Sequence, residues 1–289
     1  MDTATAIDSV SVKQTNGIEI YSLRKLGSTV AVVNKGGMLW SYNAASCGEA
    51  LFQRDHPKGV PSAENLARGG VPKMFPIIGP GETLGMGLHG NLRAETFQRI
   101  TDQAQLNGSD LALEYHHDGK AYPNFPYSYS YRTDYLLPES GRGQTLVQTD
   151  TIHNTGLQDM EVQIGQHNYF RTASRATTVL GLKDTPYFDQ MSKEQQAATG
   201  QSLFMNHVSG EINCLYVLPT QKVTLADPSW GRRIHLSYDG YSQLIVWNPG
   251  QRDLGNLAPV NNQYFVCLEP CELSTKMRIP AGGTVKLSQ

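Results

Sequence analysis

The stretch Tyr127-Ser128-Tyr129-Ser130-Tyr131-Arg132 places an aromatic residue at every second position and a polar residue between. Successive side chains of a β-strand point to opposite faces, so a period of two predicts a strand with one apolar face. Neighbouring runs alternate in the same way: Leu111, Leu113 and Tyr115 before it, and Val147, Thr149 and Thr151 against Gln148 and Asp150 after it. We expect each run to form a strand with its polar groups on the other face.

Strand-like runs recur along the whole chain, and turn-forming clusters separate them. The further runs cover residues 18–23, 29–33, 176–180, 215–218, 243–247 and 264–268. The best helical window is residues 192–199 (SKEQQAAT), about two turns long. Because no repeat or linker interrupts the pattern, we predict an all-β fold, with residues 1–289 forming one large antiparallel domain.

The composition excludes several classes of protein. A chain of 289 residues with 39% hydrophobic and 17% charged residues lacks the signature of disorder. Its 24 basic and 26 acidic residues give a net charge of −2, which argues against a general nucleic-acid partner. Neither a membrane-length apolar run nor a signal peptide is found, so we expect a cytoplasmic protein without a membrane partner. A monomer is compatible with the sequence, which does not define the oligomeric state.

The four cysteines do not suggest a disulfide framework or a zinc motif. Cys267 and Cys271 are four positions apart in a strand-like run, about 13 Å at 3.3 Å per residue. A disulfide needs Cα atoms within roughly 7 Å, so these two would bridge only if Pro270 bent the chain sharply. No paired CxxC pattern is present. We expect all four cysteines to be small, buried and reduced.

Residues 57–90 break the alternating pattern, with many glycines and prolines. A long irregular segment of this kind is often functional, and the apolar residues in it favour packing, so we expect a loop that forms a site. Arg68 and Arg93 flank much of it; guanidinium groups suit anion binding, but from the local sequence alone ordinary surface ion pairs are the simpler interpretation. His89 precedes Gly90, whose missing side chain would let a ligand approach closely.

Two further titratable residues lie in strand-like surroundings. His167 ends a strand-like run in Gly165-Gln166-His167-Asn168-Tyr169-Phe170, and Glu269 closes the apolar run Val266-Cys267-Leu268-Glu269-Pro270. Desolvation there would raise the pKa of the carboxyl group and prepare it for proton transfer near neutral pH. From local sequence alone, a hydrogen-bonded structural histidine and a solvated strand-end glutamate are the simpler interpretations.

In chain order these segments resemble a known family. The series RGGVP, FP, HG followed by Arg93, HNYF, YFD, VWNPG and FVCLEP is similar to the aldose 1-epimerase superfamily, within it most to the hexose-6-phosphate mutarotases, or glucose-6-phosphate 1-epimerases. The resemblance covers nearly the whole chain. It implies a galactose-mutarotase-like β-supersandwich and an isomerase that interconverts the α and β anomers of an aldohexose. It also implies a small sugar or sugar phosphate as partner and no cofactor or metal.

The resemblance assigns roles to individual residues. Glu269 matches the general base of the family, His167 matches the general acid, and His89 resembles the second histidine, near the ring oxygen and C1. Arg68 and Arg93 match the arginines thought to clamp the 6-phosphate. Asp189 also resembles a family position, but we interpret it as structural.

Two departures leave the substrate open. Asn213 stands where the family usually has an aspartate that contacts sugar hydroxyls, so it lacks the charge and one acceptor oxygen. The common HGFAR is replaced by His89-Gly90-Asn91-Leu92-Arg93. A weakly catalytic or non-catalytic carbohydrate-binding protein of the same fold, or an epimerase for unphosphorylated aldoses, are therefore the alternatives.

Overall fold

The computed structural model describes residues 9–54, 66, 68–173, 177–205, 210–217 and 221–289. Within these ranges the chain forms four antiparallel sheets and one short α-helix, α1 (Gln103–Leu106), in agreement with the predicted all-β class. The start of the chain, residues 57–65 of the irregular loop, Ala176 and Leu218 lie outside the described residues. The prediction of a single domain stays a prediction.

Two five-stranded sheets contain the alternating runs first noticed in the sequence. One has the order β1 (Ser9–Thr15), β2 (Ile18–Lys25), β3 (Ser28–Val33), β4 (Met38–Ala44) and β5 (Gly48–Glu49). The other has the order β22 (Thr284–Ser288), β10 (Val147–Asn154), β9 (Ser128–Leu136), β8 (Leu111–Asp118) and β7 (Gln98–Arg99). Tyr129 and Tyr131 of β9 are buried, which confirms the predicted apolar face of that strand.

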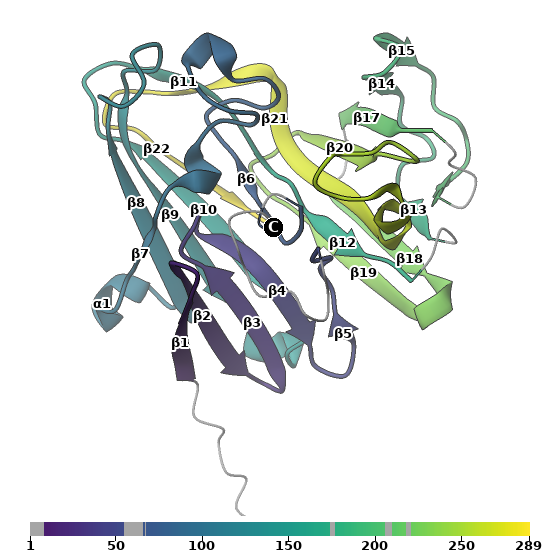
Figure 1. The fold of residues 1–289 in the computed structure, drawn as a ribbon, viewed down its shortest axis with the longest axis horizontal. Helices are drawn as coiled ribbons and strands as arrows, with labels where there is room; N and C mark the ends of the chain where they lie inside the picture. Colours follow the sequence, from purple (N-terminus) through teal and green to yellow (C-terminus); the bar gives the residue numbers. More distant parts are fainter. Residues whose placement is uncertain (1–8, 55–65, 67, 174–176, 206–209, 218–220) are drawn as a thin grey trace, which may run out of the picture.

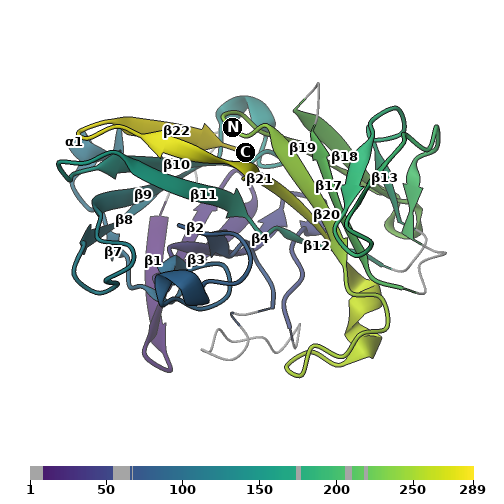
Figure 2. The same ribbon diagram turned by 90° about the horizontal axis from the view of Figure 1, so that it is seen from above.

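The third sheet carries the candidate site. Its order is β15 (Glu194–Gln196), β14 (Tyr187–Asp189), β17 (Ile212–Val217), β20 (Gln243–Asn248), β21 (Phe265–Ile279), β11 (Met160–Gln166) and β6 (Lys73–Met74), and β12 (Tyr169–Arg171) also pairs with β21. A four-stranded sheet follows the order β16 (Leu203–Phe204), β13 (Thr178–Leu180), β18 (Lys222–Asp227) and β19 (Arg232–Ser237). Figures 1 and 2 show β11 and β21 between the purple strands β1–β5 and the green strands β13, β18 and β19.

Short 3-10 helices lie in the connections between strands. They are η1 (Glu82–Leu84), η2 (Leu92–Ala94), η3 (Glu139–Gly141), η5 (Pro228–Trp230) and η6 (Pro259–Tyr264). Within the described ranges, no helix is long and apolar enough to cross a membrane.

One large core cluster contains residues from all four sheets, among them Val30, Tyr131, Val246 and Leu225. A smaller cluster covers the opposite face of β20 and β21, with Ile245, Trp247, Cys267 and Phe265 among its members. Even-numbered residues at the start of β21 therefore pack into the large cluster. The odd-numbered residues point to the opposite face, which carries the candidate site.

Strand β10 buries the face that the sequence predicted to be polar and outward. Gln148 and Asp150 are 2% exposed, whereas Val147, Thr149 and Thr151 are half-buried. The reason is a buried polar cluster: the Nζ of Lys73 lies 3.6 Å from Asp150 Oδ1 and donates to the carbonyl of Gly37 at 2.9 Å. Gln166, the strand partner of Lys73, donates to Asp150 Oδ2 and accepts from Gln148.

Two further predictions are wrong. Residues 192–199 form no helix, because β15 pairs with β14 as a hairpin and Lys193 has a positive φ of 62° in its turn. The four cysteines are all free, as predicted, but Cys47 is exposed rather than buried. It follows β4 in a surface turn, where the chain offers no core for it to pack against.

Candidate active site

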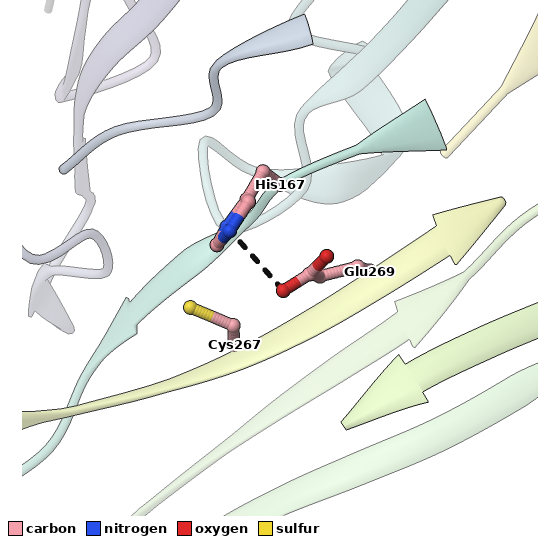
Figure 3. Close-up of side chains that lie close together, drawn as sticks. All are labelled: His167, Cys267 and Glu269. Atoms are coloured by element: carbon pink, nitrogen blue, oxygen red, sulfur yellow. Dashed lines mark ion pairs between the residues drawn. The ribbon is translucent and has the colours of Figure 1, made fainter. Parts of the chain in front are cut away.

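The strand register brings His167 and Glu269 together. β12 pairs with β21 so that Tyr169 lies opposite Cys267. His167 precedes Tyr169 by two positions and Glu269 follows Cys267 by two positions. In an antiparallel pair these two residues therefore face each other. The imidazole Nδ1 lies 3.4 Å from a carboxylate oxygen (Figure 3). Glu269 lies in the middle of β21 rather than at a strand end, since the strand continues past Pro270 to Ile279.

Both side chains are taken out of water, Glu269 to 3% exposure and His167 to 6%. Burial raises the pKa of the Glu269 carboxyl well above its ordinary value. Burial, followed by the proximity of His89 and of the guanidinium groups of Arg93 and Arg68, lowers the pKa of His167 well below its ordinary value. The Nδ1 atom of His167 has no hydrogen-bond partner, so the 3.4 Å contact is not aligned as a hydrogen bond. The pair is thus poised to hold one proton.

Aromatic side chains hold the imidazole in place. The ring of Tyr169 stacks on His167 with centroids 4.6 Å apart and an angle of 7°, and Trp247 meets it edge-on at 5.5 Å. Trp247 itself donates from Nε1 to Glu211 at 2.8 Å. These residues were not among the predicted site residues, although both lie in the segments HNYF and VWNPG that carry the resemblance.

His89 enters from the irregular loop, as the sequence predicted, and its ring centroid lies 5.6 Å from that of His167. Its Nδ1 accepts a hydrogen bond from the backbone N–H of Gly79 at 3.0 Å, which fixes the ring. Burial, followed by the charges of Arg93 and Arg68, lowers the pKa of His89 to about 3, so the ring is neutral near pH 7.

Gly90 is required for a different reason from the one predicted. A Cβ at this position would lie 2.1 Å from the carbonyl oxygen of Phe75, and the residue has a φ of 74°. The missing side chain therefore accommodates the chain itself rather than a ligand. This close approach packs the end of the loop against its middle, where the N–H of Phe75 also donates to the carbonyl of His89 at 3.2 Å, and it positions His89.

Arg68 and Arg93 both lie near His89 and near each other. Arg68 donates from Nε to Asn256 Oδ1 at 3.0 Å and from a terminal nitrogen to the hydroxyl of Tyr169 at 3.4 Å. Arg93 donates to the carbonyl of Leu88, and its pKa is lowered by burial and by the nearby Arg68. No carboxylate of the described residues forms an ion pair with either guanidinium, so the surface-ion-pair interpretation is not supported.

Asn213 and Asp189 lie farther along the sheet. Asn213 pairs with Trp247 across β17 and β20, so it shares the face that carries His167 and Glu269, and its Oδ1 accepts from Gln190 at 2.6 Å. Asp189 pairs with Cys214 and so lies on the other face, where it accepts from the N–H of Met191. The structure thus gathers five predicted residues, Arg68, Arg93, His89, His167 and Glu269, while no contact joins Asn213 to them.

Similar solved structures define the class of fold. A "putative mutarotase" from Salmonella typhimurium superposes with a TM-score of 0.76 at 17% identity, over 96% of this chain and 91% of that one. A galactose mutarotase-like protein from Clostridium acetobutylicum gives a TM-score of 0.71 at 14% identity, over 97% of both chains. The protein therefore has the galactose-mutarotase-like β-sandwich fold that the sequence predicted.

The particular family follows from sequence. The family model described as aldose 1-epimerase matches residues 19–286, so the chain belongs to the aldose 1-epimerase family. Two relatives bear the name "Putative glucose-6-phosphate 1-epimerase". The relative from Escherichia coli is 23% identical, and the match covers 88% of this chain and 83% of the relative. The one from Haemophilus influenzae is 24% identical, and the match spans about half of each protein, 50% of this chain and 52% of the relative. Membership of this family supports an isomerase.

Proposed function

We propose that this protein is a mutarotase that interconverts the α and β anomers of an aldohexose, with a hexose 6-phosphate as its substrate. The observation that carries the proposal is the buried His167–Glu269 pair, 3.4 Å apart, near the guanidinium groups of Arg68 and Arg93, for which the described residues supply no carboxylate partner. The first feature supplies acid–base chemistry and the second supplies an anion site. Membership of the aldose 1-epimerase family agrees with the acid–base chemistry, and the name glucose-6-phosphate 1-epimerase of its relatives agrees with the anion site.

In the proposed mechanism the Glu269 carboxylate takes the proton of the C1 hydroxyl while the His167 imidazolium gives a proton to the ring oxygen. The bond between C1 and the ring oxygen breaks, and the open-chain aldehyde forms. Rotation about the C1–C2 bond presents the other face of the aldehyde. The ring then closes as His167 takes back its proton and Glu269 returns its proton to the oxygen on C1. Each positioned acid or base contributes roughly 10²–10⁴ in rate.

Burial favours the uncharged forms of the pair, the Glu269 carboxylic acid and the neutral His167 imidazole. Moving one proton from Glu269 to His167 creates the carboxylate and imidazolium that the mechanism needs. The hydroxyl groups of a bound sugar offset the cost by donating to the carboxylate. Because Nδ1 of neutral His89 accepts from the N–H of Gly79, its proton lies on Nε2, and this N–H can donate a hydrogen bond to the ring oxygen or to the oxygen on C1 without adding a second positive charge.

Arg68 and Arg93 support the phosphorylated substrate. Guanidinium groups make charge-assisted hydrogen bonds with phosphate oxygens about twice as strong as neutral ones. Burial is the main cause of the lowered pKa of Arg93 and the charge of Arg68 adds to it, so a dianion between the two guanidinium groups would relieve their mutual repulsion. Asn213 lies on the same face of the sheet, and in this proposal it hydrogen-bonds a hydroxyl group of the sugar.

The test is the rate of anomerisation of glucose 6-phosphate, measured by NMR exchange between the two C1 protons with and without protein. Free glucose at the same concentration is the control for the phosphate. We expect strong acceleration for the phosphosugar and weak acceleration for glucose. Saturable binding without acceleration would favour a carbohydrate-binding protein, and equal acceleration of both sugars would favour an epimerase for unphosphorylated aldoses.

A further inference from the structure

Cys267 is a buried thiol that the proposed mechanism does not use. It is 0% exposed and precedes Glu269 by two positions on β21, so both side chains point to the same face. His167 reaches this face from the neighbouring strand. The sulfur of Cys267, a ring nitrogen of His167 and a carboxylate oxygen of Glu269 all lie within 4.8 Å of one another (Figure 3).

We propose that His167, Cys267 and Glu269 form a binding site for a thiophilic divalent cation, and that Zn²⁺ is the cation it suits best. One nitrogen, one sulfur and one oxygen donor are all ligands that Zn²⁺ takes in proteins, whereas a thiolate disfavours Mg²⁺ and Ca²⁺. Three protein ligands leave a fourth tetrahedral position for water or a sugar hydroxyl, as in catalytic zinc sites.

The distances are compatible with one ion. With metal–ligand bonds of about 2.0–2.3 Å, tetrahedral nitrogen and oxygen ligands lie about 3.3 Å apart, and sulfur lies about 3.6 Å from either. The Nδ1 of His167 and the Oε1 of Glu269 are already 3.4 Å apart. All separations are at most 4.8 Å, so the sulfur has to move by at most about an ångström to reach tetrahedral spacing.

A second, independent observation concerns His167. Its Nδ1 atom is buried without a hydrogen-bond partner, although such atoms are nearly always paired in folded proteins. The ring cannot easily turn towards another partner, because Tyr169 stacks on it and Arg68 donates to the hydroxyl of that tyrosine. A lone pair on a fixed, neutral imidazole is the form that binds a metal ion.

The charges balance in the complex. Arg68 and Arg93 oppose a bare cation, but Zn²⁺ with one thiolate, one carboxylate and a neutral imidazole carries no net charge. Coordination removes the proton of a thiol outright, so the ion itself would complete the ligand set.

If the proposed function holds, zinc and anomerisation exclude each other, because the ion occupies both the acid and the base. Zinc would then act as a reversible inhibitor. The binding itself rests only on the three side chains, so it can be tested whether or not the protein is a mutarotase.

The experiment titrates the metal-free protein with Zn²⁺ by calorimetry and with Co²⁺ by absorption spectroscopy, since a cobalt–thiolate bond adds a charge-transfer band. The variant is Cys267→Ser, and Cys47→Ser, at the exposed thiol, is the matched control. We expect one Zn²⁺ per chain and a cobalt–thiolate band that only Cys267→Ser removes. Loss of a group that only hydrogen-bonds to a metal ligand already lowers metal affinity about 10–100-fold. Loss of the Cys267 ligand itself should therefore lower the affinity for Zn²⁺ at least about tenfold.

No zinc binding by the wild type, equal affinity in Cys267→Ser, or loss of the band in Cys47→Ser would each overturn the proposal. Circular dichroism checks that every variant is folded. Should Cys267→Ser not fold, Glu269→Gln serves instead, with the expectation of weaker zinc binding and a retained thiolate band. Inhibition by one equivalent of Zn²⁺ and its reversal by a chelator test the consequence for anomerisation separately.

Discussion

His167, between β11 and β12, faces Glu269 of β21 with Nδ1 and a carboxylate oxygen 3.4 Å apart, and both side chains are nearly excluded from water. Burial shifts their pKa values in opposite directions, up for the acid and down for the imidazole. Two titratable groups shifted in this way share a proton as a unit. Loss of either group should therefore stop the same reaction.

Glu269→Gln and His167→Ala should each lower kcat for glucose 6-phosphate anomerisation by about 10²–10⁴. Gln keeps the size of the side chain but cannot take a proton, and Ala removes the imidazole. The rates come from NMR exchange, and circular dichroism checks folding. Glu161→Gln, at an exposed position of β11, is the control and should behave as the wild type. Normal turnover in either of the first two variants, once folded, would exclude the assigned roles.

The sequence predicted the strands best where apolar side chains alternate, as at Tyr129 and Tyr131, because burial of one face is a local signal. The alternation did not predict which face of β10 is buried. Asp150 is buried there beside Lys73, with which it forms an ion pair and which is far away in the sequence. The sequence also failed at residues 192–199, since pairing with β14 outweighs the weak helical preference of so short a window.

The site residues show the same division. His167 and Glu269 had no decisive local signal, and their order along the chain identified them only through the resemblance. The role of Cys267 beside them depends on the register between Tyr169 and Cys267, which no local pattern reveals. Likewise Gly90 was assigned to ligand access, although it is the backbone of Phe75 that approaches it.

Arg93→Ala and Arg68→Ala should raise KM for glucose 6-phosphate about 10–100-fold and change KM for free glucose little. The reason is that a hydrogen bond to a charged group contributes about 1.5–3 kcal/mol. Steady-state kinetics with both sugars measure the difference. Arg24→Ala, at an exposed position of β2, controls for loss of positive charge and should affect neither sugar. Equal increases for both sugars would remove the phosphate role of the arginines.

His89 should make the protein less stable as the pH falls. Its pKa is about 3 in the folded state against about 6.5 in the unfolded chain, so the unfolded state binds the proton more tightly. The stabilisation is complete above pH 6.5 and is lost towards pH 3, by up to about 1.4 kcal/mol per pH unit. Urea unfolding at pH 7 and pH 5 should show a smaller loss for His89→Gln than for the wild type.

His116→Gln is the control for this measurement, because the side chain of His116 is 72% exposed. It should lose as much stability between the two pH values as the wild type does. If the wild type and His89→Gln lose the same free energy of unfolding between pH 7 and pH 5, His89 is not the neutral, buried group inferred above.

Lys73→Met should lower the free energy of unfolding by about 3–5 kcal/mol, because it leaves the Asp150 carboxylate buried without its cation. Lys73→Met with Asp150→Asn should recover part of the loss, since no unpaired charge remains. Lys120→Met is the matched control: its ion pair with Asp118 is 3.3 Å long but exposed, and its loss should cost at most about 1 kcal/mol. Urea unfolding of all four proteins measures these differences. If Lys73→Met and Lys120→Met lower the free energy of unfolding equally, the buried Lys73–Asp150 pair contributes no more to stability than a surface ion pair does.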